Sequence, residues 1–192
     1  MTEHAFLTDG RVSLRPVESS DLPSLRAAWN DPTVWQMLDT VEPQSEADFR
    51  ELYESWRADD GFVPFAIDAD GLVGCCQVKG IHWQSGICRL SYFVLPARQG
   101  EGYASAAVRL ALEYAFDHLR LHRVEAATVG GNEASQAVLE KAGFTHEGTA
   151  RNKAFVDGDY HDLLSWGILA AEWVEEQDPS EPDESGRGGR LA

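Results

Sequence analysis

The sequence contains little lysine. Only Lys79, Lys141 and Lys153 occur among 16 basic residues, against 32 aspartates and glutamates, which gives a formal net charge of -16 at pH 7 and a pI of about 4.6. A field of this sign repels phosphate, so nucleic-acid binding by a basic face is disfavoured. Strong acidity with arginine in place of lysine is typical of halophilic proteins from a salt-rich cytoplasm. An ordinary acidic protein would show the same composition, so both interpretations stay open.

Cysteine is also scarce, and long apolar runs are absent. Cys75, Cys76 and Cys88 form no CxxC pair, and adjacent residues of a strand point to opposite faces, so we expect three reduced, buried thiols. The N-terminus lacks a basic region followed by an apolar run, and no stretch reaches the roughly 18 apolar residues of a membrane span. We therefore expect a soluble, cytoplasmic protein that does not bind membranes.

The remaining composition is typical of one globular domain. A chain of 192 residues with 43% hydrophobic residues is long enough to bury a core. Near the C-terminus the sequence turns polar, with acidic residues, prolines and Gly188-Gly189. We predict one domain over residues 1–176 and an acidic, disordered tail over residues 177–192.

Strand and helix patterns alternate along the domain. Alternating or continuous apolar runs predict strands at about 11–16, 65–67, 72–81, 87–95, 124–129, 145–155 and 160–169. Apolar residues at helical spacing predict helices at about 20–29, 45–56, 102–119 and 132–142. Because strands precede, alternate with and follow helices, we predict the α/β (α+β) class, with one mixed sheet of about seven strands flanked by helices.

One turn combines two glycines with the start of a helix. An apolar strand runs through Gly100 and Gly102 directly into the helix predicted at 102–119. Glycine allows positive φ and lets a ligand approach backbone N–H groups closely. The helix start adds unsatisfied N–H groups and the positive end of the helix dipole. The turn is therefore a candidate pyrophosphate site that requires no lysine.

Other interpretations of this turn compete. A dinucleotide-binding fingerprint needs a third glycine, but Ser105 stands there, and the motif belongs in a first strand–helix unit rather than in mid-chain. A nucleoside-triphosphate loop ends in Gly-Lys-Ser/Thr, and this turn does not. A third interpretation stays open: a plain strand-to-helix turn, in which the glycines serve the backbone geometry alone.

Two blocks of the sequence resemble the GNAT superfamily of N-acetyltransferases. Gln99, Gly102 and Ala104 match its acetyl-coenzyme A signature, Gln/Arg-x-x-Gly-x-Gly/Ala. The segment Asn132–Phe144 is similar to the Asn-x-x-Ser…Gly-Phe pattern of the branch that acetylates ribosomal-protein N-termini. The likeness spans roughly residues 11–169, with the blocks in the family's order and spacing.

The resemblance implies a single GNAT-like domain that transfers an acetyl group directly from acetyl-coenzyme A to a primary amine. Two adjacent parallel strands would splay to admit the pantetheine arm, and no metal is needed. The cofactor-binding residues that it implies are Phe93, Val94, Leu95, Arg98, Gln99, Gly100, Glu101, Gly102, Tyr103, Ala104 and Asn132. Asn132 also suits a simple helix N-cap, and the two roles are compatible.

The resemblance also implies catalytic and acceptor residues. Ser135 would donate a proton or a hydrogen bond to the leaving thiolate. Relatives often carry a carboxylate as general base in the strand before the signature, but Arg89 holds that position here. Glu147 is the substitute carboxylate that we predict, and a water relay is the alternative. The aromatic residues expected to line the acceptor pocket are Trp29, Trp35, Tyr92 and Tyr160.

We predict the N-terminal α-amine of a protein, in particular a ribosomal protein, as the acceptor. A small-molecule amine (an aminoglycoside, a polyamine or an amino acid) is the alternative within the enzyme class. A non-catalytic module that keeps acetyl-coenzyme A as a sensor stays open because of Arg89. The protein would be a monomer or a homodimer. His118 and His122 stand four residues apart without a third ligand, so we expect no metal site.

Overall fold

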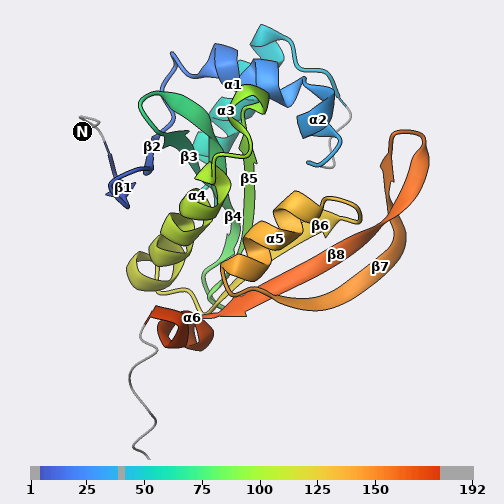
Figure 1. Cartoon of the computed structure of the whole chain (residues 1–192). Helices are drawn as coiled ribbons and strands as arrows, with labels where there is room; N and C mark the ends of the chain where they lie inside the picture. Colours follow the sequence, from blue (N-terminus) through green and yellow to red (C-terminus); the bar gives the residue numbers. More distant parts are fainter. Residues whose placement is uncertain (1–4, 39–41, 178–192) are drawn as a thin grey trace, which may run out of the picture.

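One mixed sheet organises the molecule. The computed structural model describes residues 5–38 and 42–177, and the sheet has eight strands in the order β1-β2-β3-β4-β5-β6-β8-β7 (Figure 1). The strands are β1 (Leu7–Thr8), β2 (Ser13–Pro16), β3 (Val63–Asp68), β4 (Leu72–His82), β5 (Ile87–Val94), β6 (Arg123–Val129), β7 (Thr145–Val156) and β8 (Asp159–Leu169). The predicted single mixed sheet with flanking helices is confirmed, and β1 is the strand that the sequence did not reveal, because two residues show no periodicity.

Helices cover both faces of this sheet. They are α1 (Leu22–Trp29), α2 (Pro32–Trp35), α3 (Glu46–Ala58), η1 (Pro96–Arg98), α4 (Tyr103–Glu113), η2 (Tyr114–His118), α5 (Glu133–Lys141) and α6 (Ala170–Gln177). The helix predicted at 102–119 is α-helical only as far as Glu113 and then widens into the π-helical segment η2. The short helix α2 is not among the predicted helices. Asp31 caps it by accepting a hydrogen bond from the Thr33 N–H (2.9 Å), and Pro32 is its first residue.

The cysteines show how the two faces differ. Cys75 packs with α1 and α3 in one core, whereas Cys76 and Cys88 pack with α4 in the other. All three thiols are free and buried, as predicted. Burial raises the pKa of Cys75 and of Cys88 to about 12, so these thiols stay protonated at neutral pH.

The central strands β5 and β6 run parallel and then separate. Their ladder pairs Ile87, Cys88 and Arg89 with residues 123–125 and ends there. Beyond Arg89, β5 pairs only with β4, and β6 pairs only with β8. This is the splay that the resemblance implies. It leaves main-chain groups of β5 available to a ligand that enters between the strands.

The chain continues as a helix after β8. The side chain of Trp173 in α6 is 3% exposed and packs against Phe116, so burial of this ring holds the helix on the domain. Gln177 is the last described residue, and residues 178–192 of the predicted tail lie outside the described residues. No helix within residues 5–38 and 42–177 has both the length and the apolar character needed to cross a bilayer.

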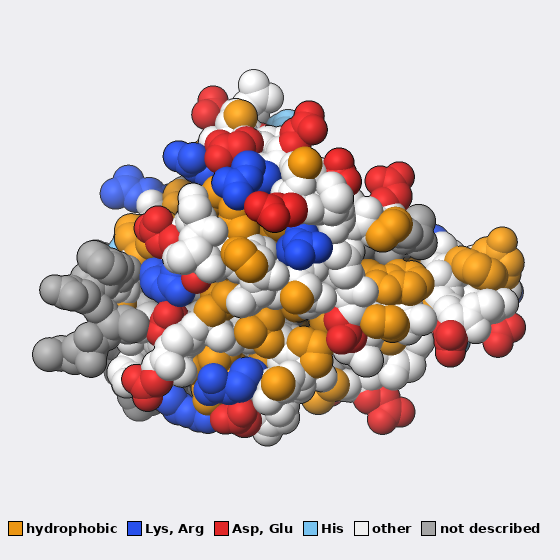
Figure 2. Space-filling model, turned by 90° about the horizontal axis from the view of Figure 1, so that it is seen from above, with side chains coloured by type: hydrophobic (Ala, Val, Ile, Leu, Met, Phe, Trp, Pro, Cys, Tyr) orange, Lys and Arg blue, Asp and Glu red, His pale blue; other side chains and the backbone are white. Residues whose placement is uncertain are grey.

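Charged side chains lie mainly on the surface. Figure 2 shows acidic side chains spread over the face seen from above, with basic ones between them. The α3 pairs Arg50–Glu46 (3.5 Å) and Arg57–Glu54 (3.3 Å) are exposed, and pairs of this kind contribute about 0–1 kcal/mol each.

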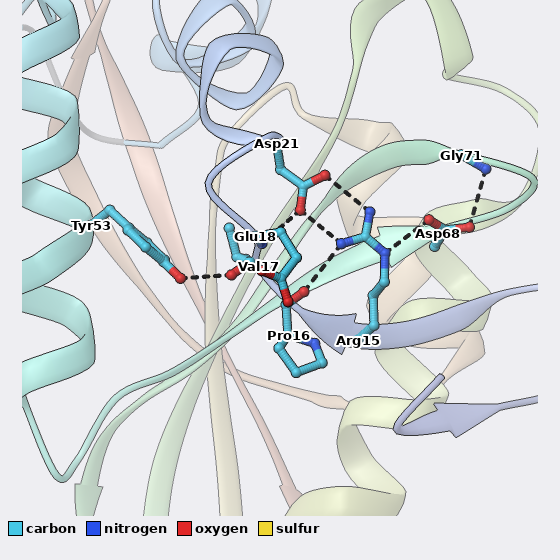
Figure 3. A network of polar contacts seen from close by, with 8 residues as sticks. All are labelled: Arg15, Pro16, Val17, Glu18, Asp21, Tyr53, Asp68 and Gly71. Carbon is cyan, nitrogen blue, oxygen red and sulfur yellow. Dashed lines mark hydrogen bonds and ion pairs between the residues drawn. The ribbon is translucent and has the colours of Figure 1, made fainter. Parts of the chain in front are cut away.

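A buried ion-pair network is the exception, and it ties β2 to α1 and to the β3–β4 turn (Figure 3). Arg15 donates two hydrogen bonds to Asp21 (2.7 and 3.0 Å) and one to Asp68 (2.9 Å). The Asp21 carboxylate also accepts from the Glu18 N–H (2.8 Å), and Asp68 accepts from the Gly71 N–H (3.1 Å). The network fixes the position of α1 over the sheet edge.

Candidate active site

A cavity of about 770 Å³ opens where β5 and β6 separate. Its walls include residues of α4 and α5 on one face of the sheet, such as Ala104 and Val138. On the other face its walls include Val34 of α2 and the following residues Met37 and Leu38. Because the walls come from both faces, two reactants can approach the gap between the strands from opposite sides.

The glycine turn forms one end of the cavity. Gly100 and Gly102 have φ values of +79° and +81°. A Cβ atom added at Gly100 would meet nothing within 4 Å, and one added at Gly102 would meet only Nη1 of Arg11 at 3.6 Å. No side chain caps α4, so N–H groups of its first turn remain available at Tyr103 and Ala104. Open space before such N–H groups fits a phosphate group.

Two arginines flank this turn. The guanidinium carbons of Arg11 and Arg98 lie 5.1 and 5.2 Å from the centre of the Tyr103 ring. Arg98 also donates to the Tyr103 hydroxyl (2.8 Å), and Arg11 donates to the carbonyl of Glu101 (2.5 Å). The sequence did not reveal Arg11, because its contact joins residues 90 positions apart. Both cations favour an anionic ligand at the turn.

Tyr92 and Ser135 both line the cavity and contact each other. The phenol oxygen of Tyr92 lies 2.8 Å from Oγ of Ser135. The Asn132 side chain accepts from the Ser135 N–H (3.1 Å), so Asn132 is the N-cap of α5 and also lines the cavity. Burial raises the pKa of Tyr92 to about 12, so its phenol keeps the proton at neutral pH and can donate a hydrogen bond.

The structure brings most of the predicted cofactor residues to this cavity. Those that line it are Phe93, Val94, Arg98, Gln99, Gly100, Gly102, Tyr103, Ala104 and Asn132. Leu95 packs against the α1–α3 core instead, and the Glu101 carboxylate accepts from the Tyr103 hydroxyl (2.9 Å).

Of the four aromatic residues expected around the acceptor, only Tyr92 lines the cavity. The Trp29 ring packs against Phe49 and Phe93 in the α1–α3 core, and Trp35 is half-buried on α2 outside the cavity wall. Tyr160 is 67% exposed and packs against Phe155 near the β7–β8 turn. The sequence identified aromatic residues near the site but could not show which way each ring points.

The structure does not bring Glu147 to the cavity. Arg123 donates to Glu147 from Nη1 (2.7 Å) and from Nη2, and to Glu125 from Nε (3.0 Å). A Cβ atom at Gly167 would lie 2.6 Å from the Glu147 carboxylate, so the ion pair lies over β8. The hydrogen bonds from Arg123 lower the pKa of Glu147 and make it a weaker base. Glu147 therefore takes part in an ion pair that links β6 and β7 over β8, and it does not face the gap between β5 and β6.

Acidic groups are few around the cavity. Among the described residues that line it, Glu133 is the one carboxylate, and it is exposed at the start of α5. No group of three histidine, cysteine, aspartate or glutamate residues within 5–38 and 42–177 could hold a metal ion.

Comparisons with known proteins agree with this geometry. The family model "Acetyltransferase (GNAT) domain" matches residues 11–145. The chain is 32% identical over 174 residues to YdaF of Bacillus subtilis (strain 168), a proposed ribosomal N-acetyltransferase, with 86% of this chain and 95% of YdaF covered. It is 25% identical over 169 residues to spermidine N(1)-acetyltransferase of Escherichia coli (strain K12), covering 86% and 89% of the two chains.

Solved structures show the same fold. Spermidine N-acetyltransferase from Vibrio cholerae, in complex with CoA and spermine, matches with a TM-score of 0.82 and 23% identity, covering 86% of this chain and 99% of that one. Mycobacterium smegmatis RimJ, in complex with CoA-disulfide, matches with a TM-score of 0.74 and 26% identity, covering 86% and 89%.

The chain therefore belongs to the GNAT acetyltransferase family. More specifically, it is an N-acetyltransferase that transfers an acetyl group from acetyl-coenzyme A to an amine.

Proposed function

We propose that this enzyme acetylates the N-terminal α-amine of a protein, with a ribosomal protein as the first candidate. The observation that carries the proposal is the scarcity of bases around the cavity, where Glu133 is the one carboxylate of the described lining residues. An α-amine has a pKa near 8, so about a quarter of it is neutral at pH 7.5, against about one part in a thousand of a lysine-like amine. The similarity to YdaF and to RimJ supports the same acceptor class.

Acetyl-coenzyme A supplies the acetyl group as an activated thioester. We assign its pyrophosphate to the turn from Gln99 to Ala104, with Arg98 and Arg11 beside it. The main chain of β5 from Phe93 to Leu95 would pair with the pantetheine arm, and Asn132 would contact the arm from the opposite wall. The open space before the two glycines and the uncapped start of α4 support this placement.

Tyr92 and Ser135 would act on the departing sulfur. A thiol has a pKa of about 8.5, well below that of the buried Tyr92 phenol, so complete proton transfer from the phenol to the thiolate is unfavourable. Tyr92 therefore stabilises the thiolate by donating a hydrogen bond, and Ser135 holds the phenol in position. The attacking amine loses one proton as the amide forms, and water delivers one proton to the thiolate, so the exchange balances without an acyl-enzyme.

Removal of the Tyr92 hydroxyl is expected to lower turnover far more than cofactor affinity. We expect Tyr92→Phe to reduce kcat by about 10- to 100-fold, in line with the loss of one charge-stabilising donor, and Ser135→Ala by a smaller factor. The acetyl-coenzyme A Kd should change by less than about threefold in both variants, because neither hydroxyl is assigned to cofactor binding.

Steady-state kinetics and calorimetry would separate these effects, with Tyr160→Phe as the matched control on an exposed ring. The double variant should lose little more than Tyr92→Phe, because the two hydroxyls act as one unit. An unaltered kcat in Tyr92→Phe, or a raised Kd with normal kcat, would remove the catalytic role.

The acceptor class can be tested by a pH profile. For an α-amine acceptor, kcat/KM should rise about tenfold per pH unit at low pH and level off near pH 8. A polyamine is the second candidate, favoured by the similarity to spermidine acetyltransferases, and it would extend the rise toward pH 10. Competition between an alanine-starting peptide and spermidine in one assay gives the same answer, and preferential use of spermidine would overturn the proposal. A cytoplasmic location and a monomeric or homodimeric state remain predictions.

A further inference from the structure

Two basic side chains lie together where the β5–β6 ladder ends and the two strands begin to separate. Lys79 of β4 and Arg89 of β5 are directly opposite each other in the antiparallel ladder, and both line the cavity. Directly opposite residues project from the same face of a sheet, here the face of Cys75 and Phe93, which pack against α1–α3. Neither cation forms a hydrogen bond or an ion pair with any residue in 5–38 or 42–177.

Arg89 is exposed and Lys79 is half-buried, so an anion that enters the cavity can reach both cations. Like charges directly opposite on a sheet repel each other. Burial and the neighbouring Arg89 both lower the pKa of Lys79. The acidic residue nearest in register is Glu125, which pairs with Arg89 in the β5–β6 ladder, but its carboxylate accepts from Arg123 Nε (3.0 Å). The hydrogen-bond donors of Lys79 and Arg89 are therefore left for a ligand.

The charge of the cavity is opposite to that of the protein. The chain carries a net charge of -16, whereas the charged residues that line the cavity are Lys79, Arg89, Arg98 and a single acid, Glu133. Figure 2 shows many acidic side chains on the face seen from above. The composition of the chain therefore does not account for a basic cavity.

The cofactor phosphates do not account for Lys79 and Arg89 either. The glycine turn lies beyond the end of β5 at Val94. Arg89 lies five positions before Val94, which is about 17 Å along a strand. Arg98 already serves that end of the cavity. The Lys79–Arg89 pair lies instead on the α1–α3 side of the sheet, opposite the face that α4 covers.

We propose that Lys79 and Arg89 form an anion subsite that selects acceptors with a carboxylate close to the reactive amine. This inference rests on the proposed function, because it places the acceptor amine in the split. A guanidinium pairs with a carboxylate through two parallel hydrogen bonds, and the ammonium adds a further charge-assisted bond. The carboxylate can come from an acidic side chain that follows the N-terminal residue of a peptide, or from a free amino acid. A polyamine is repelled.

The test measures binding and turnover with matched acceptors. Two pentapeptides that differ only by Asp or Asn at the second position, free aspartate and spermidine would be titrated into the protein saturated with coenzyme A. We expect the Asp peptide to bind about tenfold or more tightly than the Asn peptide, as one charge-assisted contact requires. If free aspartate binds as tightly as the Asp peptide, the acceptor is a small amino acid; weaker binding of aspartate identifies a peptide.

Variants of the pair connect the preference to these residues. Arg89→Gln and the double variant with Lys79→Gln should bind both peptides equally, while Arg50→Gln, on the exposed face of α3, should keep the preference. Arg89→Glu should improve spermidine binding. Because each substitution at Lys79 or Arg89 removes like-charge repulsion, Tm of these variants should not fall, which excludes unfolding as the cause.

The outcomes separate the two proposals. Equal binding of both peptides by the unaltered protein, or a preference that survives in the double variant, overturns the anion subsite. A preference that depends on Arg89, with acetyl transfer to none of these acceptors, supports the subsite and overturns the proposed acceptor. Transfer to both peptides with equal kcat/KM and equal affinity overturns the subsite alone.

Discussion

Gly102→Val is expected to weaken acetyl-coenzyme A binding by about 100-fold or more, through the loss of two or more charge-assisted hydrogen bonds. A valine side chain at Gly102 would project into the open space before the turn, where only Nη1 of Arg11 lies within 4 Å of its Cβ. It would cover the N–H groups of Tyr103 and Ala104 at the start of α4. Calorimetric titration with acetyl-coenzyme A measures the loss directly.

A matched control separates blocked binding from backbone strain. Gly102 has a φ of +81°, so valine costs about 1–2 kcal/mol there whatever the ligand does. Gly158, in the β7–β8 turn, has a φ of +89° and nothing within 4 Å of an added Cβ. Gly158→Val should lower Tm by a similar amount and leave cofactor affinity unchanged. Equal affinities in the two variants would remove the pyrophosphate site from this turn.

Arg15→Ala is expected to lower the free energy of unfolding by about 3–5 kcal/mol, because it leaves buried carboxylates without their cation. Asp21 and Asp68 are 7% and 4% exposed, and Arg15 donates hydrogen bonds to both. Chemical denaturation of the variant and of the unaltered protein gives the difference.

Two further variants show whether the network is the cause. Arg15→Lys keeps the charge but cannot form the paired bonds to Asp21 and the bond to Asp68 together, so an intermediate loss is expected. Arg50→Ala removes an exposed arginine whose pair with Glu46 spans 3.5 Å, and it should cost less than about 1 kcal/mol. A loss in Arg15→Ala no larger than that of Arg50→Ala would show that the network contributes little.

The predicted site residues that line the cavity come mostly from segments that are continuous in the sequence. The glycine turn and the start of α5 each lie within a few residues, and the Asn132 cap joins residues three apart. Ser45 likewise accepts from the Asp48 N–H (3.2 Å) and starts α3, as its residue type indicates. Local chemistry decides such features, so a single sequence is enough to find them.

The predicted site residues that do not line the cavity differ from the others in the direction of their side chains. Glu147 and Tyr160 stand in correctly predicted strands, yet they point to an ion pair over β8 and to an exposed turn. Alternate residues of a strand face opposite ways, and bulges in the β7–β8 ladder change the alternation. The order of residues gives the strand but not the side to which each member points.

The sequence alone determined the class of fold, the glycine turn before α4 and the acidity, because these depend on residue types and on neighbours along the chain. Only the tertiary structure decided which distant groups meet: Tyr92 with Ser135, 43 residues apart, and Arg11 with the carbonyl of Glu101. It also placed Lys79 opposite Arg89 inside the cavity of an acidic protein. These contacts depend on the strand register and on the separation of β5 from β6. Both arise from packing across the whole sheet.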